Sequence, residues 1–478
     1  MGRSQDIRLG ALLGIYLCTM ATISLGDPHA WTGTSNNNWF IPENWDPAGV
    51  PSEGDAVTFA SGSILLTNPV QNLQSFTMTG GTLTFTNWLT HLEATNIMVS
   101  GGTVTLPTAF VQGLTSNRVW FACTNFTLGT NGTINVSFKG YTMNSGPGKG
   151  SGTTYGSGGG YGGHGAFAQG GNNGGTAYGS ITNPTDPGSG GANGNDIGGP
   201  GGGVVRIDAP GGTVTVYGTI SANGKVRNSY HAGSGSGGSI GITCRTFAGS
   251  PNGLLTATGA NSTHGGGAGG GGRIAVIYDP VAQAGNNPGV RFQASAGTGG
   301  FSQGSVGRVA EDGTLYLSDN TFLSETLSGQ FLSVRLYGVT NWNPAQLTVG
   351  NTQLILEETG LQLTVAGNVV IDSGGELGLG SNSIFQCNNL NLTNGGLLHV
   401  YAGATNGLGV DYGAMVSITN TVRVASNSWI YPYSQPSDGG SPLPVDSLKN
   451  VTEAMLASSL THIDVTEGRL GWFSGDGQ

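Results

Sequence analysis

Four residues that could perform acid–base chemistry stand close together in a chain with few charges. They are Lys225, Arg227, Tyr230 and His231, whereas only 9% of the 478 residues are charged. Cleavage of a uronic acid polymer by elimination requires a base such as Tyr, His or Lys, and a cation that neutralises the sugar carboxylate. This set is therefore the candidate site of a polysaccharide lyase. The alternative, which we favour, is a solvated loop between two repeats, so no catalytic residue is assigned.

Carboxylate pairs suited to glycoside hydrolysis are harder to find. Hydrolysis requires two carboxyl groups about 5–9.5 Å apart. Residues 311–312 and 357–358 are adjacent acidic pairs, and neighbouring side chains on a strand point to opposite faces. Asp372 and Glu376 could pair only across neighbouring segments, which the sequence leaves open.

Aromatic residues offer a second kind of candidate site, because their rings can stack on sugars. The tryptophans near the N-terminus have an alternative role, favoured here, as shields at the end of a hydrophobic core. The tyrosines lie in a glycine-rich run. The candidate ligand-binding residues are Trp31, Trp39, Trp45, Tyr155, Tyr161 and Tyr178.

A metal site is suggested only at Asp196. Residues 193–199, Asn-Gly-Asn-Asp-Ile-Gly-Gly, are similar to a calcium-binding nonapeptide repeat. A single copy cannot supply the ligands that come from successive turns, so a local Asx-turn is the favoured interpretation. The glycine-rich segments are not followed by Gly-Lys-Ser/Thr, so they do not predict a phosphate-binding loop. Cys123, Cys244 and Cys387 are too far apart for a zinc or disulfide framework. No cofactor is expected.

Charge and the N-terminal residues restrict the partners and the location. The formal net charge is −10, without clustered Lys and Arg, so nucleic acid and anionic membranes are not expected partners. Arg3 and Arg8, an apolar run over residues 9–23, and Ser24 and Gly26 at the −3 and −1 positions predict a signal peptide over residues 1–26. The alternative is an uncleaved anchor helix, and no later stretch could span a bilayer. We expect a secreted or cell-surface protein.

A short repeat predicts the fold. Residues 76–85 and 97–106 each contain two alternating strands separated by Gly-Gly, and residues 370–379 and 392–400 repeat the pattern. The interval from Gly80 to Gly101 equals the interval from Gly374 to Gly395. A fixed repeat interval is typical of stacked coils that bury their apolar faces against each other. The sequence therefore predicts an all-β, right-handed parallel β-solenoid (β-helix); a sandwich of hairpins is the alternative.

Glycine dominates the middle of the chain. Of the 58 residues from 146 to 203, 25 are Gly, and three longer repeats follow at intervals of about 35 residues. Such a run could be a flexible linker, but its aromatic residues favour an ordered, partly polyproline-II insertion. The predicted divisions are a signal peptide (1–26), an N-terminal cap with β-solenoid coils (27–143), a glycine-rich region with three β repeats (144–300), C-terminal coils (301–440) and a tail (441–478).

Two stretches carry a resemblance to known proteins. Trp31-Thr32-Gly33, Trp39, Asn44-Trp45 and residues 51–59 resemble the opening of bacterial secreted autotransporter-passenger-like β-solenoid surface proteins. Residues 158–165, 187–191 and 271–276 resemble glycine-rich blocks of surface proteins from polysaccharide-degrading bacteria, and distantly the glycine-rich domain of the anaplastic lymphoma kinase ectodomain. The resemblance implies a capping coil over the first stretch and a cell-surface role.

These patterns lead to a functional hypothesis. We expect a secreted or cell-surface structural, adhesive protein that contacts polysaccharide without catalysis. The alternative is a β-helical polysaccharide lyase or glycoside hydrolase that uses the set at residues 225–231. A third hypothesis is binding to a flat, ordered surface through regular Thr rows.

Overall fold

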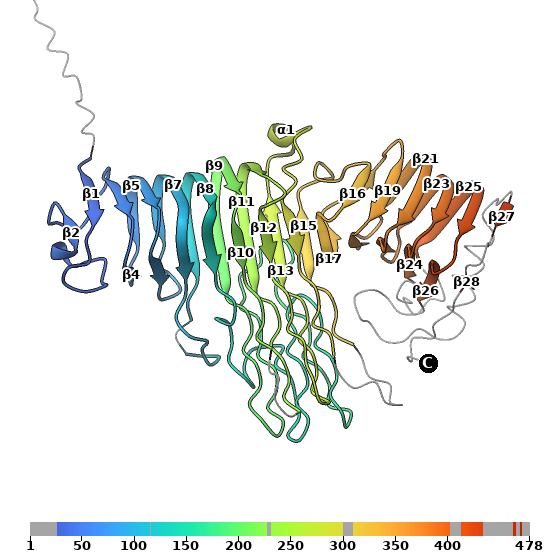
Figure 1. Ribbon diagram of the computed structural model, residues 1–478, viewed down its shortest axis with the longest axis horizontal. Coiled ribbons are helices and arrows are strands. Elements are labelled where there is room, and N and C mark those ends of the chain that lie inside the picture. The colour runs from blue at the N-terminus through green and yellow to red at the C-terminus, as the bar shows by residue number, and fades with distance from the viewer. Residues whose placement is uncertain are drawn as a thin grey trace, which may run out of the picture.

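A computed structural model describes residues 26–114, 116–226, 231–299, 309–401, 413–433, 462–464 and 469–470. The predicted signal peptide, apart from Gly26, and most of the predicted tail lie outside these residues. The molecule is elongated, and its strands lie side by side along the long axis (Figure 1).

Nearly all regular structure is β. The helical elements are η1 (Pro42–Asn44) and α1 (Pro280–Gln283), and within the described ranges no helix is long and apolar enough to cross a membrane. The N-terminal strands are β1 (Pro28–Trp31), β2 (Trp45–Asp46), β3 (Ala56–Phe59), β4 (Ser63–Leu66), β5 (Val70–Met78), β6 (Thr82–Phe85), β7 (Leu92–Thr105) and β8 (Val119–Asn135).

The remaining strands fall into a central and a C-terminal set. The central strands are β9 (Val204–Val216), β10 (Thr219–Ser221), β11 (Ser239–Gly249), β12 (Leu254–Thr256), β13 (Arg273–Ile277), β14 (Arg291–Gln293), β15 (Thr314–Leu317) and β17 (Phe331–Tyr337). The C-terminal strands, with the short β16, are β16 (Thr326–Ser328), β18 (Asn341–Trp342), β19 (Leu347–Gly350), β20 (Gln353–Leu356), β21 (Gln362–Asp372), β22 (Glu376–Leu379), β23 (Ile384–Leu392), β24 (Leu397–Tyr401), β25 (Met415–Val424), β26 (Trp429–Tyr433), β27 (His462–Asp464) and β28 (Arg469–Leu470).

Alternation of apolar and polar residues explains these strands. In β5 and β6 the side chains of Phe76, Met78, Leu83 and Phe85 are fully buried, while the intervening threonines face outward. This period of two is the strand period. Neighbouring strands pair in parallel, with Phe76 opposite Ile97 of the next repeat. The all-β content and the parallel strands predicted from the sequence are confirmed.

The way in which the central sheet closes differs from the prediction. Strand β8 pairs with β9 through residues 119–128 and with β10 through residues 133–135. Strand β17 joins the two rows of strands that begin at β9 and β10. Its residues 331–332 pair with β14, and its residues 335–337 pair with β15. Nine parallel strands therefore form a closed ring in the order β8, β9, β11, β13, β15, β17, β14, β12 and β10.

The predicted right-handed parallel β-solenoid with a glycine-rich insertion is consequently wrong. The main sheet is a closed nine-stranded parallel barrel with further strands outside it, because β8 bonds to both β9 and β10 and β17 bonds to both β14 and β15. The hairpin sandwich also fails, since among the described pairings of named strands only β1 with β2 is antiparallel. A second sheet contains β16, β19, β21, β23, β25 and β27 in that order, with β18 paired to β21.

The glycine-rich residues are connections of the barrel. Long segments leave β8, β10, β12 and β14 and return at β9, β11, β13 and β15, and Figure 1 shows them as loops gathered below the strands. We call these four segments the glycine block. Single backbone hydrogen bonds link the first segment to the second and the third: Gly159 donates to the Ser234 carbonyl (2.9 Å), and Gly270 donates to the Gly159 carbonyl (2.9 Å). Residues 156–163 are buried, so this stretch is packed structure and not a solvated linker.

Buried polar side chains join the glycine block to the strands. Arg335 of β17 donates from Nη2 to the Gly162 carbonyl oxygen (2.6 Å). The Tyr161 hydroxyl lies 2.6 Å from the Ser239 hydroxyl of β11. Because these contacts link residues far apart in the sequence, they fix the block against the barrel.

Candidate functional site: an open groove across four strands

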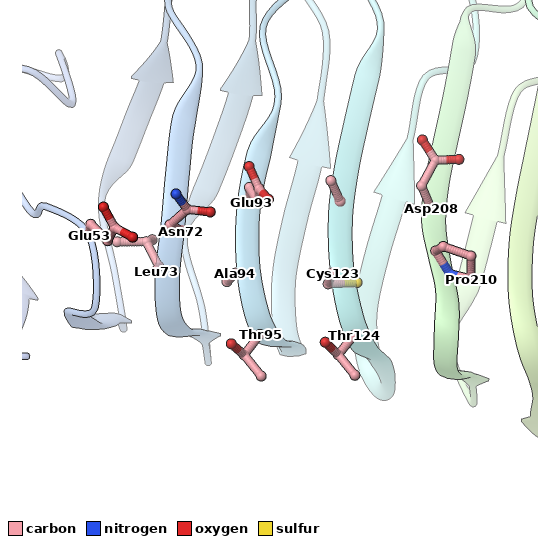
Figure 2. Close-up of a pocket in the computed structure, with 11 residues that line it drawn as sticks. Glu53, Asn72, Leu73, Glu93, Ala94, Thr95, Cys123, Thr124, Asp208 and Pro210 are labelled. Carbon is pink, nitrogen blue, oxygen red and sulfur yellow. The ribbon is translucent and has the colours of Figure 1, made fainter. Parts of the chain in front are cut away.

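An open groove of about 630 Å³ crosses β5, β7, β8 and β9. Its polar lining includes three carboxylates, those of Glu53, Glu93 and Asp208. Figure 2 shows Asn72 beside Glu93, and Thr95 beside Thr124, on neighbouring strands of this surface. The groove therefore runs across the strands, along the long axis of the molecule.

Strand register places two of the carboxylates in one row. Glu93 of β7 is opposite Ala122 of β8, and Ala122 is opposite Asp208 of β9. Neighbouring strands lie about 4.8 Å apart, so the backbones at Glu93 and Asp208 are about 10 Å apart. The small side chain of Ala122 between them leaves the floor of the groove open.

Asp208 is held by two donors. Arg206 Nε donates to Asp208 Oδ2 at 2.6 Å, and Trp120 Nε1 donates to the same oxygen at 2.8 Å. Charge-assisted hydrogen bonds of this kind are shorter and stronger than those between neutral groups. Asp208 is therefore a fixed acceptor at one wall of the groove.

A group of planar side chains surrounds Trp120 next to this wall. The guanidinium carbon of Arg118 lies 4.2 Å from the Trp120 ring centroid and 4.9 Å from that of Trp88. Arg206 lies 5.1 Å from the Trp120 centroid, and the His91 ring lies 4.7 Å from it. Burial, and then the positive charge of Arg206, lower the pKa of Arg118 to about 10, although Asp208 acts in the opposite direction.

Cys123 also lines the groove. Burial, with a smaller contribution from Asp208, raises the pKa of its thiol to about 12. Since only the thiolate is a strong nucleophile, Cys123 is not suited to covalent catalysis at neutral pH.

The predicted lyase set lies elsewhere. Arg227 and Tyr230 lie outside the described residues. Lys225 Nζ is 6.0 Å from the Phe138 ring centroid. His231 Nδ1 is 3.1 Å from Asn195 Nδ2, and its ring packs 4.1 Å from that of Tyr155. Neither described member of the set lines the groove.

The predicted tryptophan platform is part of the core. Trp31, Trp39 and Trp45 are buried, and their rings pack edge to face, with centroids 5.0 Å apart for Trp31–Trp45 and 4.7 Å for Trp39–Trp45. Trp45 Nε1 donates to the Trp39 carbonyl oxygen at 2.8 Å. These rings shield the N-terminal end of the core and present no surface on which a sugar could stack.

The predicted tyrosine sites are used within the glycine block. Tyr161 is fully buried, and the half-buried Tyr178 donates to the Pro187 carbonyl oxygen at 2.5 Å. Tyr155 is half-buried against His231. The three rings therefore stabilise the block.

The acidic candidates form local contacts. Asp196 Oδ1 accepts from the Ile197 amide (2.6 Å), so this exposed loop caps its own backbone. Asp312 Oδ1 accepts from the Ala296 amide (2.7 Å), and Glu376 Oε1 lies 2.8 Å from His399 Nε2. Within the part of the chain that the structure describes, no three His, Cys, Asp or Glu side chains are grouped as metal ligands are.

The groove residues were not predicted from the sequence because they are far apart in the chain. Glu93 and Asp208 are separated by more than a hundred residues, and only the register through Ala122 brings them into one row. A usable signal was the Arg-x-Asp pattern at Arg206 and Asp208, since alternate residues of a strand share one face.

Comparison with protein families, with curated proteins and with solved structures finds no match to this chain.

Proposed function

We propose that this protein is a secreted or cell-surface protein that binds polysaccharide without cleaving it, and that the groove is its binding site. The row formed by Glu93, Ala122 and Asp208 carries the proposal. It supplies a carboxylate on each side of an open floor, and that of Asp208 is held in place by its two donors. The extracytoplasmic location rests on the predicted signal peptide over residues 1–26.

The chemistry of the lining suits a hydroxyl-rich polymer. Carboxylates accept charge-assisted hydrogen bonds from hydroxyl groups, and Asn72, Thr95 and Thr124 add neutral donors and acceptors. Because the groove is open and crosses the strands, a long chain has room to pass through it. Bridging water commonly supplements such polar contacts.

Glycoside hydrolysis is the second candidate. The separation of about 10 Å between the Glu93 and Asp208 backbones is compatible with the carboxyl spacing of inverting enzymes, about 6.5–9.5 Å. Because Asp208 Oδ2 already accepts two hydrogen bonds within the protein, its carboxylate is suited to a positioning role, and this favours binding without cleavage.

Filling the floor of the groove tests the proposal. Ala122→Leu places a larger side chain between the two carboxylates, and Thr127→Leu is the matched control on the same strand outside the groove. The purified protein is titrated with soluble xylan, β-glucan and galactan by calorimetry. We expect binding to at least one polymer, weakened tenfold or more by Ala122→Leu and unchanged by Thr127→Leu.

Two results contradict the proposal. One is the absence of binding to any polymer, and the other is equal affinity for the wild type and Ala122→Leu. New reducing ends that appear with the wild type and not with Glu93→Gln establish hydrolysis in place of simple binding.

A further inference from the structure

Arg118 is a buried cation whose guanidinium lies against rings. The residue is only 6% exposed, and its Nε is buried without a hydrogen-bond partner. The rings beside it are those of Trp88 and Trp120. Cation–π contacts offset part of the desolvation of a guanidinium but satisfy none of its N–H groups.

The nearby carboxylate of Asp208 is already used. It accepts from Arg206 Nε and from Trp120 Nε1 on the same oxygen. Two arginines, Arg118 and Arg206, therefore share the surroundings of one acid, and each lies against the ring of Trp120. A buried charge is stable only when it is paired, so this cluster favours the arrival of an additional anion.

The cluster of Arg118, Trp120 and Arg206 lies next to the groove. Trp120 lies midway in sequence between Arg118 and Ala122, which is on the groove floor. Trp120 and Ala122 are alternate residues of β8 and so share one face, and the Arg118 guanidinium lies 4.2 Å from the Trp120 ring centroid. Trp120 contacts both Arg118 and the groove residue Asp208. A group attached to a polymer in the groove could reach Arg118 along this face.

We propose that Arg118 binds an anionic substituent, a carboxylate or a sulfate ester, on the polysaccharide that occupies the groove. The inference rests on the proposed function and specifies its ligand. A guanidinium matches the oxygens of such groups with two parallel N–H bonds.

The charge of the groove restricts the ligand further. Glu53, Glu93 and Asp208 repel a polymer that carries a negative charge on every sugar. The preferred ligand is therefore a mostly neutral chain with sparse anionic substituents.

The experiment compares oligosaccharides that differ by one charged group. One pair is xylo-oligosaccharide with and without a single glucuronic acid side group, and the other is galactan oligosaccharide with and without a single sulfate. We expect the wild type to bind the charged member of at least one pair tenfold or more tightly. The pair that responds identifies the carboxylate or the sulfate as the ligand group.

Variants assign this preference to Arg118. Arg118→Met is expected to remove the preference and to retain binding of the neutral member, whereas Arg118→Lys retains a reduced preference. Arg245→Met removes the same charge from an exposed position on β11 and should leave the preference intact. Circular dichroism monitors the fold of each variant.

The outcomes separate the two proposals. Binding of the neutral oligosaccharide without any gain from the charged group overturns the role of Arg118 and leaves the groove intact. A preference that persists in folded Arg118→Met overturns it as well. Failure of the wild type to bind any of the oligosaccharides contradicts the proposed function. If Arg118→Met does not fold, the wild-type preference and the Arg118→Lys variant still test whether Arg118 binds the anionic group.

Discussion

Residues of the strand core and residues of the glycine block are shielded from water by different kinds of neighbour. Around Phe121 of β8, the rings of Phe85 and Phe126 pack with centroids 5.2 Å away. Around Gly158 in the block, the neighbours are backbone atoms, and the Gly158 amide donates to the Ala166 carbonyl at 3.0 Å. A Cβ atom at Gly158 would overlap the carbonyl oxygen of Ala268. The strand core excludes water with large side chains, whereas around Gly158 the block does so with closely packed backbone atoms.

This difference shows what each region must contribute to folding. Burial of a large side chain removes apolar surface from water. Ordering glycine costs more backbone entropy than ordering any other residue, and the block has few apolar side chains with which to offset that cost. Its stability therefore depends on interlocking backbone hydrogen bonds and on anchors such as Arg335 and Tyr161.

The largest effect is expected in the strand core. Phe121→Ala removes a fully buried ring from between Phe85 and Phe126 and should lower the free energy of unfolding by about 3–5 kcal/mol. Val281→Ala at a side chain that is 86% exposed should change it by less than about 0.5 kcal/mol. Urea denaturation followed by circular dichroism measures both. Equal effects at the two positions would contradict the packing described for this core.

A methyl group should be enough to disturb the glycine block. Gly158→Ala forces the chain away from Ala268 and should cost about 1–3 kcal/mol. Gly211→Ala is the matched control, because a Cβ at Gly211 meets nothing within 4 Å. Limited proteolysis should show faster cleavage within residues 146–203 of Gly158→Ala, with the strands intact. An equal loss of protection in strands and block would show that the two regions unfold as one unit, and unchanged stability would refute the close approach.

Lowering the pH should change the free energy of unfolding in opposite directions through a carboxyl group of the strand region and one of the glycine block. This is the smallest of the three expected effects. In the strand region, burial raises the pKa of Glu376, but the hydrogen bond and charge of His399 outweigh it and leave this pKa below its ordinary value. The stabilisation from Glu376 is therefore present above its unfolded pKa, about 4.3, and is lost as the pH falls through the lower folded value. In the glycine block, burial raises the pKa of Asp312. Its ionisation is a cost at neutral pH that is relieved as the pH falls through the raised folded value.

The free energy of unfolding as a function of pH checks these signs. Glu376→Gln should weaken the loss of stability in acid, and Asp312→Asn should weaken the gain that develops as the pH falls from the raised folded pKa of Asp312 to its unfolded pKa. Glu43→Gln, at an exposed carboxylate of η1, should leave the profile unchanged. A change of the same sign in both variants would show that burial does not distinguish the two carboxyl groups.

Local pattern predicted much of the β structure. The alternation around Phe76 and Ile97 predicted the strands, and the interval between these repeats matches their register. Closure of the barrel could not be predicted, because it depends on β8 and β17 each bonding to two different strands. The groove could not be predicted for a related reason: Glu93 and Asp208 come into one row only through their register with Ala122. The candidate residues chosen by type, the tryptophans and tyrosines, proved to be packing residues, since aromatic rings serve cores as readily as ligand sites.

The sequence by itself determined that this protein consists of strands with apolar residues on one face, because a period of two is a property of neighbouring residues. The fixed interval between repeats predicted that these strands stack in parallel. The sequence also determined that glycine would dominate the long connections. Only the tertiary structure decided that nine strands close into a barrel and that Arg118, Trp120 and Asp208 meet beside an open groove. Those outcomes depend on which distant strands share hydrogen bonds, and no local pattern in the chain encodes that choice.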